Sequence, residues 1–303
     1  MDTISETTVP KKNVILAMFL VTFAILSWSG NIFVSKVTAQ SIPPFLLNCL
    51  RWIGAGLILT PFAIKPIIKD WAVIQKNWLI LSFFSFLAVS IFNALLYLSA
   101  HTTSAINIAV ISTLTPLCTF IVAWLLYRNS PTKVQILGFG LGIIGVLILI
   151  FKGQVMRLLE FQFTIGDIWM FLAVVAWAFY AVTLPVKKPK ISQVSFLYCT
   201  IVLGVIIALP AVWLEYQSGA RWQLSPTDKW SLLYLSLIPS LLSYLFYNYG
   251  LSILGAIKTA MFSYLMPVFT AILSMIWLGE TIASYHVIGQ LLVMAGFYFS
   301  VVK

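Results

Sequence analysis

Long apolar segments alternate with short polar ones along almost the whole chain. Within each segment the apolar residues run continuously and do not alternate with a period of two, which predicts helices and not the strands of a barrel. A helix needs roughly 20 apolar residues to cross a bilayer. We therefore expect ten transmembrane helices, at residues 14–34, 45–64, 78–97, 105–126, 134–151, 168–186, 194–214, 230–249, 256–278 and 285–302.

The composition supports an all-α membrane protein. Of the 303 residues 61% are hydrophobic and 9% are charged, whereas soluble domains carry roughly 25% charged residues. The first apolar segment could also be read as a signal peptide, because Lys11 and Lys12 precede it and Val37-Thr38-Ala39 resembles a cleavage site. An uncleaved first helix is the simpler interpretation, since nine further spans follow.

The positions of the basic residues predict the orientation in the membrane. With the N-terminus inside, the inner segments hold Lys11, Lys12, Lys65, Lys69, Lys76, Arg128, Lys133, Lys187, Lys188, Lys190 and Lys303, and the outer loops hold Lys152, Arg157, Arg221 and Lys229. Cytoplasmic loops carry such an excess of Lys and Arg. We therefore expect both termini in the cytoplasm and interpret the basic loop residues, which give the net charge of +10, as a solvated surface. The expected surroundings are the lipid bilayer, with no nucleic acid partner.

The second half of the sequence repeats the first. A shift of 151 positions aligns 105–151 with 256–302 without a gap and pairs Ser112 with Ser263, Pro116 with Pro267, Gly138 with Gly289 and Gly145 with Gly296. Because five spans are an odd number, the second copy must be inverted, as in many transporters. The expected organisation is a cytoplasmic tail (1–13), a first repeat (14–151), an outer loop (152–165) and a second repeat (166–303).

Several motifs resemble those of the drug/metabolite transporter superfamily, in particular its EamA-type bacterial metabolite exporters. They are Trp28-Ser29-Gly30-Asn31, Arg51, Ser-Thr-Leu-Thr-Pro at 112–116 with glycines at 138, 142 and 145, and Met266-Pro267-Val268-Phe269 with Leu278-Gly279-Glu280-Thr281. One departure is Tyr127-Arg128-Asn129 in the first half, where members often show a Gly-Glu pair. We interpret that pair as a turn and helix cap, so its absence here does little to weaken the resemblance to the superfamily.

The resemblance implies a fold and a class of function. Spans 1 to 4 and 6 to 9 would surround a central cavity, with spans 5 and 10 at the periphery, in the inner membrane if the chain is bacterial. Many bacterial members export amino acids or related metabolites. Relatives carry nucleotide sugars or sugar phosphates, so transport of sugar-phosphate, nucleotide-type or drug-like substrates stays an alternative, as does a channel.

Polar residues inside spans are the best candidates for a binding site, because they are costly in a membrane. Asn93 and Tyr97 share one face of the third span, and Tyr244 and Asn248 share one face of the eighth. A shift of 151 positions aligns Asn93 with Tyr244 and Tyr97 with Asn248, so each Asn in one half corresponds to a Tyr in the other. They could line a cavity for a polar substrate or hydrogen-bond the helices together.

Further candidates come from the other spans. The substrate-binding set also contains aromatic and amide residues of spans 1, 4 and 6 and one lysine of span 9: Trp28, Asn31, Asn107, Trp177, Tyr180 and Lys258. Arg51 stays charged in a protein and could bind a substrate carboxylate or phosphate, or serve a structural role. Lys36 and His101 at span ends are interpreted as interfacial.

The acidic residues and cysteines narrow the function further. No predicted span carries a central Asp or Glu, so a neutral, zwitterionic or anionic substrate is favoured over a cation. The three cysteines lie inside spans and suggest no metal or redox role. No paired catalytic set is present, so we expect no enzyme activity and no cofactor. The oligomeric state stays open.

Overall fold

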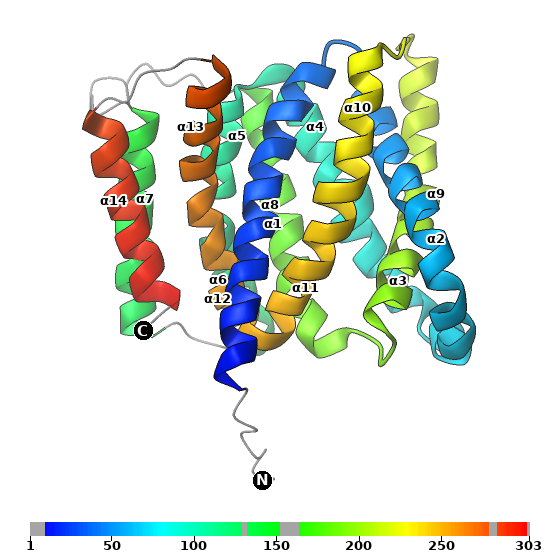
Figure 1. Ribbon diagram of the computed structural model, residues 1–303, viewed down its shortest axis with the longest axis horizontal. Helices are drawn as coiled ribbons and strands as arrows, with labels where there is room; N and C mark the ends of the chain where they lie inside the picture. The colour runs from blue at the N-terminus through cyan, green and yellow to red at the C-terminus, as the bar shows by residue number, and fades with distance from the viewer. Residues whose placement is uncertain (1–9, 129–131, 152–163, 279–283, 302–303) are drawn as a thin grey trace.

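The computed structural model describes residues 10–128, 132–151, 164–278 and 284–301, and every regular element within these ranges is helical (Figure 1). The first half contains α1 (Lys11–Thr38), α2 (Pro44–Lys76), α3 (Trp78–Ser85), η1 (Phe86–Ile91), α4 (Phe92–Thr102), α5 (Ala105–Ser112), α6 (Thr115–Tyr127) and α7 (Lys133–Ile150). The second half contains α8 (Ile165–Lys187), α9 (Gln193–Gln217), α10 (Pro226–Leu235), η3 (Ser236–Leu242), α11 (Ser243–Leu254), α12 (Ala256–Met261), η4 (Phe262–Tyr264), α13 (Leu265–Leu278) and α14 (Ser284–Val301).

Seven helical segments in the described part are long and apolar enough to cross a membrane. They are Lys11–Thr38, Pro44–Lys76, Trp78–Thr102, Asn107–Tyr127, Ile165–Lys187, Gln193–Gln217 and Pro226–Leu254. The remaining expected spans are also helical over their described residues, as α7, as α12 with η4 and α13, and as α14, but they are shorter or interrupted. The chain is thus a multi-pass helical membrane protein.

Two expected spans are broken at corresponding places. The span at 105–126 divides into α5 and α6 just before Pro116, and the span at 256–278 passes through the short 3₁₀ element η4 just before Pro267. Proline lacks a backbone N–H and clashes with the preceding turn, so helices tend to end or change pitch ahead of it. The two prolines, which are paired by the shift of 151, therefore mark the same local break in both halves.

Two π-helical segments, η1 and η3, interrupt the long helices at 78–102 and 226–254. They also lie at corresponding places of the two halves, because the shift of 151 carries 86–91 onto 237–242. A π-helix bonds each N–H to the carbonyl five residues earlier and is frequent at functional sites. Nothing in the apolar pattern of 86–91 predicts it.

Helices from the two halves pack against each other in matched pairs. The pair α7 and α14 stands at one side of the bundle, while α2 and α9 pack together at the other (Figure 1). Between them, α1 packs on α11 and α13, and α8 packs on α4 and α6. The core of the molecule lies among α1, α2, α4, α8 and α11, where the largest fully buried side chains gather.

Glycine permits the close approach of α7 and α14. A Cβ added to Gly145 would lie 2.6 Å from the carbonyl oxygen of Gly289, and one added to Gly296 would lie 2.7 Å from the carbonyl oxygen of Gly138. Backbones can approach this closely only where small residues face each other. The four glycines are two pairs related by the shift of 151, so each helix uses the same positions to contact the other.

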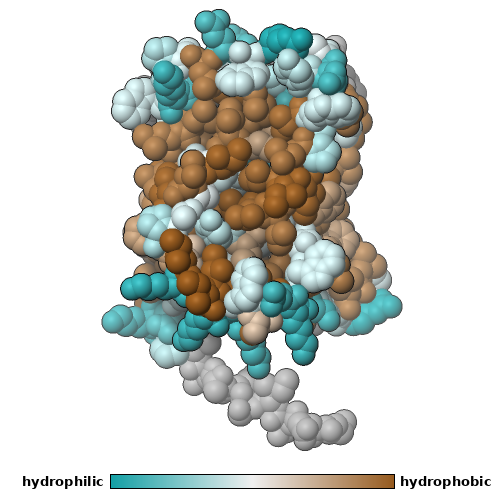
Figure 2. Space-filling model, turned by 90° about the vertical axis from the view of Figure 1, so that its right-hand side faces the viewer, coloured by the Kyte–Doolittle hydropathy of each residue, from teal (hydrophilic) through white to brown (hydrophobic). Residues whose placement is uncertain are grey.

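The outer surface has the distribution expected in a bilayer. Figure 2 shows a broad hydrophobic band around the middle of the molecule and hydrophilic side chains at both ends. Leu57, Phe62 and Ile68 of α2 and Ile206 of α9 are among the exposed large apolar residues in this region. Such exposure is explained by contact with lipid.

Candidate functional site

A connected network of buried polar side chains lies inside the bundle, around Arg51 of α2. Arg51 is fully buried. Its Nε donates a hydrogen bond of 2.8 Å to Ser240 Oγ of η3. Its Nη1 donates to Asn93 Oδ1 at 2.9 Å and to the Tyr97 hydroxyl, both on α4. The guanidinium therefore links a helix of the first half to the π-helical segment of the second.

The asparagines and tyrosines of the predicted set form matched hydrogen bonds in the two halves. The Tyr97 hydroxyl donates to Asn31 Oδ1 at 3.0 Å, and the Tyr180 hydroxyl donates to Asn248 Oδ1 at 2.8 Å. A shift of 151 carries Tyr97 onto Asn248, and a shift of 149 carries Asn31 onto Tyr180. The same Asn–Tyr bond thus joins α1 to α4 in one half and α8 to α11 in the other, with the residue types exchanged.

A third Asn–Tyr bond crosses between the halves. Asn93 Nδ2 donates to the Tyr244 hydroxyl at 2.9 Å, and the shift of 151 carries one residue onto the other. All members of the three pairs are buried. The Asn and Tyr side chains are thus hydrogen-bonded to one another between helices, and they do not line an open cavity in this conformation.

The π-helical segments explain why polar side chains gather here. The carbonyl of Ala88 in η1 accepts hydrogen bonds from Asn93 Nδ2 at 3.0 Å and from the Tyr244 hydroxyl at 2.7 Å. The corresponding carbonyl in η3, that of Pro239, accepts a hydrogen bond of 3.0 Å from Trp28 Nε1. Buried carbonyls need such partners, so the network also stabilises the two irregular segments.

Aromatic rings close the centre of the bundle. Trp28 and Trp177, which the shift of 149 pairs, contact each other edge to face with ring centroids 5.1 Å apart. Trp177 Nε1 donates to the Tyr247 hydroxyl at 3.3 Å. These three residues, with Phe92, Ser112 and Met266 among others, line a cavity of about 30 Å³. A cavity of this volume holds only a few water molecules, so the centre has no room for a metabolite in this conformation.

The structure brings together most of the predicted residues but not all. Trp28, Asn31, Asn93, Tyr97, Trp177, Tyr180, Tyr244 and Asn248 belong to this buried region, together with Arg51. Asn107 lies apart, where its Nδ2 donates to Thr103 and to Asp167 Oδ1. Lys258 is exposed.

Two of the interfacial residues lie near Asn107. Lys36 Nζ donates hydrogen bonds to the carbonyls of Ala100 and Thr103 at the end of α4, so its charge stabilises a helix C-terminus. His101 is exposed at the same place. Neither residue reaches the network around Arg51.

Three residues of the region were not predicted from the sequence. Ser240 accepts from Arg51, Tyr247 accepts from Trp177, and the Trp52 ring lies with its centroid 5.1 Å from the Arg51 guanidinium carbon. Of these three, only Trp52 could have been selected from the sequence, because it stands next to a charged residue inside a span. Ser240 aligns with Val89 in the other half, and Tyr247 is one of many aromatics, so the repeat gave no reason to select them.

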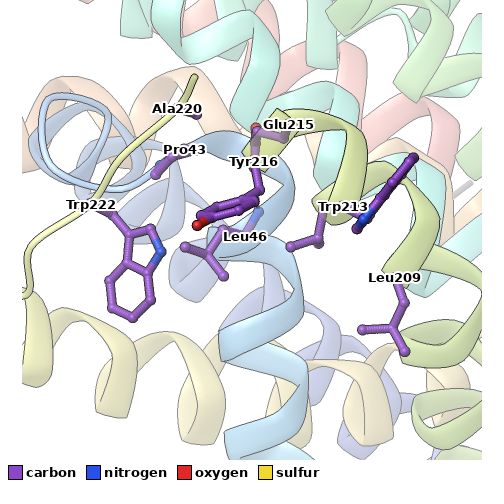
Figure 3. Close-up of a pocket in the computed structure, with 9 residues that line it drawn as sticks. Pro43, Leu46, Leu209, Trp213, Glu215, Tyr216, Ala220 and Trp222 are labelled. Atoms are coloured by element: carbon purple, nitrogen blue, oxygen red, sulfur yellow. Dashed lines mark hydrogen bonds between the residues drawn. The ribbon is translucent and has the colours of Figure 1, made fainter. Parts of the chain in front are cut away.

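A larger cavity of about 380 Å³ opens at the end of the bundle opposite the start of α1. Figure 3 shows Pro43 and Leu46 at the start of α2 facing Tyr216 and Trp222, with Glu215 above them. The Glu215 oxygens accept the backbone N–H groups of Phe45 and Leu46 at 3.1 and 2.9 Å and so cap α2. Exposed Leu209 and Trp213 also line it, so this cavity lies at the surface of the bundle and apart from the buried network around Arg51.

The comparisons with known proteins place the chain in a family. The sequence profile of the EamA-like transporter family matches residues 15–151 and again residues 164–302. This chain belongs to the EamA-like transporter family. Its two matches to the EamA-like profile confirm the resemblance seen in the motifs.

Within the described residues, no group of three His, Cys, Asp or Glu side chains could hold a metal ion.

Two relatives have names that state transport but no substrate. The chain is 33% identical to the uncharacterized transporter YyaM of Bacillus subtilis over 206 residues, 68% of this chain and 67% of that protein. It is 24% identical to an uncharacterized transporter of Archaeoglobus fulgidus, over 94% of this chain and 96% of that protein. A solved crystal structure matches the fold with a TM-score of 0.73 at 15% identity, covering 94% of this chain and 96% of that one.

Proposed function

We propose that this protein is a secondary transporter that exports amino acids or related small polar metabolites by alternating access. In this proposal the chain spans the membrane ten times, as two inverted repeats at 14–151 and 166–303. It lies in the inner membrane of a bacterial cell, with both of its ends in the cytoplasm. The substrate binds among the buried aromatic and polar residues at the centre. The observation that carries the proposal is the matched pair of Asn–Tyr hydrogen bonds, Asn31 with Tyr97 and Tyr180 with Asn248.

The packing of the helices supports two inverted repeats. In the repeat, α1 corresponds to α8, α4 to α11 and α6 to α13. The contacts of α1 with α11 and α13 therefore correspond to the contacts of α8 with α4 and α6. In the pairs α7–α14 and α2–α9, each helix packs on its own counterpart from the other half. A transporter built this way can pass from a conformation open on one side to one open on the other by exchanging the arrangements of its halves.

The location of the lysines supports cytoplasmic ends. The start of α1 with Lys11 and the end of α14 lie at the same end of the bundle (Figure 1). α2 and α8 also end there, with Lys76 and Lys187 in their last turns. The positive-inside rule assigns such an end to the cytoplasm.

The closed centre supports a carrier over a channel. Trp28, Trp177 and Tyr247 contact one another at the centre and line a cavity of about 30 Å³, which is too small to form a hydrated path at that place. A carrier passes through closed conformations in each cycle, whereas an open channel needs a hydrated path.

The test is a flux assay with purified protein in proteoliposomes. The panel contains aromatic and aliphatic amino acids, polyamines, sugar phosphates and nucleosides, each with and without a pH gradient. We expect saturable flux of at least one amino acid and faster flux on exchange with the same substrate inside. Absence of flux for every compound, or flux that never saturates, would contradict the carrier proposal.

A further inference from the structure

Arg51 is a buried positive charge whose partners are all neutral. It donates hydrogen bonds to Ser240, Asn93 and Tyr97. The rings of Trp52 and Tyr97 lie 5.1 and 5.7 Å from its guanidinium carbon, which provides cation–π attraction. None of these groups carries a negative charge, so the site keeps a net charge of one inside the membrane region.

The carboxylates in the described part of the chain are engaged elsewhere. Asp167 accepts from Thr103 and Thr164, Asp228 accepts from Ser41 and Ser225, Glu215 caps α2, and Asp70 accepts the backbone N–H of Ser192. All four lie near helix ends. A buried charge without a counter-charge is costly to maintain, so an anion that reached Arg51 would be strongly favoured.

Unused hydrogen-bonding atoms lie on the same face of α2 as the charge. Among the side chains that the structure describes, Arg51 Nη2, Trp52 Nε1 and Asn48 Oδ1 are buried and have no hydrogen-bond partner. Asn48 lies three residues before Arg51 and four before Trp52, so it neighbours both on the helix, and the Trp52 ring centroid lies 5.1 Å from the Arg51 guanidinium carbon. The face therefore offers two donors, one of them charged, beside one acceptor. A carboxylate has two oxygens for such donors, and an N–H group of the same molecule would suit the Asn48 oxygen.

The position of Arg51 connects this site to the movement of the two halves. Its Nε bonds to Ser240 in η3, and its Nη1 bonds to Asn93, two residues after the end of η1. When the halves separate to admit a substrate, some of these acceptors must move away from the guanidinium. A ligand with anionic oxygens can replace them, whereas a ligand without such oxygens leaves the charge unpaired.

We propose that Arg51 binds the carboxylate of the transported molecule, with Trp52 Nε1 as a second donor and Asn48 Oδ1 as an acceptor. This inference rests on the proposed transport function and names the chemical group that the site recognises. Because the site holds one positive charge, a singly charged carboxylate neutralises it. A phosphate monoester, with close to two negative charges at neutral pH, would leave excess negative charge in the same surroundings.

The first experiment compares matched ligands on the wild-type protein in proteoliposomes. The probes are phenylalanine, its amide and phenethylamine, then leucine, its amide and isoamylamine, with glucose 6-phosphate as the phosphate arm. We expect saturable flux of at least one acid, and at least tenfold less flux of its amide and its amine. Equal flux of acid and amide, or preference for the phosphate, would overturn the inference and leave the transport function standing. No flux of any probe would count against the transport function itself.

The second experiment uses variants. Trp52→Phe keeps an aromatic ring but removes the unpaired Nε1 together with part of a fully buried indole. We therefore expect a lower melting temperature and a KM for the transported acid raised several-fold in the protein that remains folded. The matched control is Trp213→Phe, an exposed residue of α9, for which we expect no change. Arg51→Lys keeps the charge but not the planar donors, and we expect a KM at least tenfold higher. An unchanged KM in both Trp52→Phe and Arg51→Lys would overturn the assignment.

Discussion

Tyr97 makes one more hydrogen bond than Tyr180, the tyrosine of the matched Asn–Tyr pair in the second half. Its hydroxyl donates to Asn31 and accepts from the charged Arg51, whereas Tyr180 donates only to Asn248. A hydrogen bond to a charged group contributes about 1.5–3 kcal/mol, while neutral hydrogen bonds between membrane helices average about 0.6 kcal/mol. The two Asn–Tyr bonds correspond in the repeat, but only the tyrosine of the first half also bonds to a charged group.

We therefore predict that Tyr97→Phe lowers the free energy of unfolding by about 2 kcal/mol and Tyr180→Phe by about 0.6 kcal/mol, on the energies of charged and neutral hydrogen bonds above. Both changes remove one hydroxyl from a fully buried ring, so each is the control for the other. The measurement is thermal unfolding of the protein in detergent. Equal losses would mean that the charge of Arg51 adds nothing to the Tyr97 bond.

The sequence predicted the members of this site better than their contacts. The repeat selected Asn93, Tyr97, Tyr244 and Asn248 because the residue types recur in swapped order. It left open whether they line a cavity or join helices, since that depends on the conformation and not on the residue types. The unused nitrogen of Arg51 could not be predicted either, because it follows from three side chains that approach it from other helices.

At the scale of elements, the α7–α14 pair depends on a few backbone contacts. A Cβ at Gly145 would lie 2.6 Å from a carbonyl oxygen and 2.7 Å from the backbone nitrogen of Val293, and backbone atoms cannot move aside as a flexible side chain can. Gly140, on the same helix, has nothing within 4 Å of an added Cβ. The two glycines differ only in what faces them.

We predict that Gly145→Ala separates α7 from α14 and lowers stability by about 1–3 kcal/mol, the usual cost of overpacking. Gly140→Ala should leave the melting temperature unchanged or slightly higher, because alanine is the better helix former. Thermal unfolding of the two variants side by side provides the measurement. A loss of similar size in Gly140→Ala would show that the close contact at Gly145 is not the cause.

The helices show what a pattern of apolar residues can predict and what it cannot. It predicted helices at ten segments, and each of these segments is mostly helical over its described residues, with seven helical segments long and apolar enough to cross a membrane. It did not predict the length of α2, which continues to Lys76, far beyond the expected end at Ile64. Nor did it predict η1 and η3, because a π-helix keeps the same apolar composition and is set by contacts with neighbouring helices. Gly204 of α9 and Gly54 of α2 face these segments.

At the scale of the whole molecule, the proposed topology makes a direct prediction. With the N-terminus inside, the proposed span count places Gly219, after the seventh span, outside, and Lys303 inside. Alkaline phosphatase fused after Gly219 in a truncated chain should be active, and the same enzyme fused after Lys303 should be inactive, whereas a fluorescent protein should show the reverse. An active phosphatase after Lys303 would contradict the proposed count of ten spans.

The pair of α2 and α9 joins the halves with one carboxylate at each end. Glu215, near the end of α9, accepts the N–H groups of Phe45 and Leu46 at the start of α2. Asp70, near the end of α2, accepts the N–H of Ser192 at the start of α9 at 2.9 Å. A carboxylate stabilises a helix N-terminus through its unpaired N–H groups and its dipole. Each helix is therefore capped by the other, on opposite sides of the membrane.

A carrier that opens one side at a time must be able to loosen these contacts separately. We predict that Asp70→Ala increases amide hydrogen exchange at the start of α9 roughly tenfold, which corresponds to about 1.4 kcal/mol of local stability, within the range for hydrogen bonds to charged groups. Exchange at the start of α2 should stay unchanged. Glu215→Ala should have the opposite effect, so the two variants control each other. Increased exchange at both helix starts in either variant would show that the two ends open together, and alternating access would then need a different pair of closing contacts.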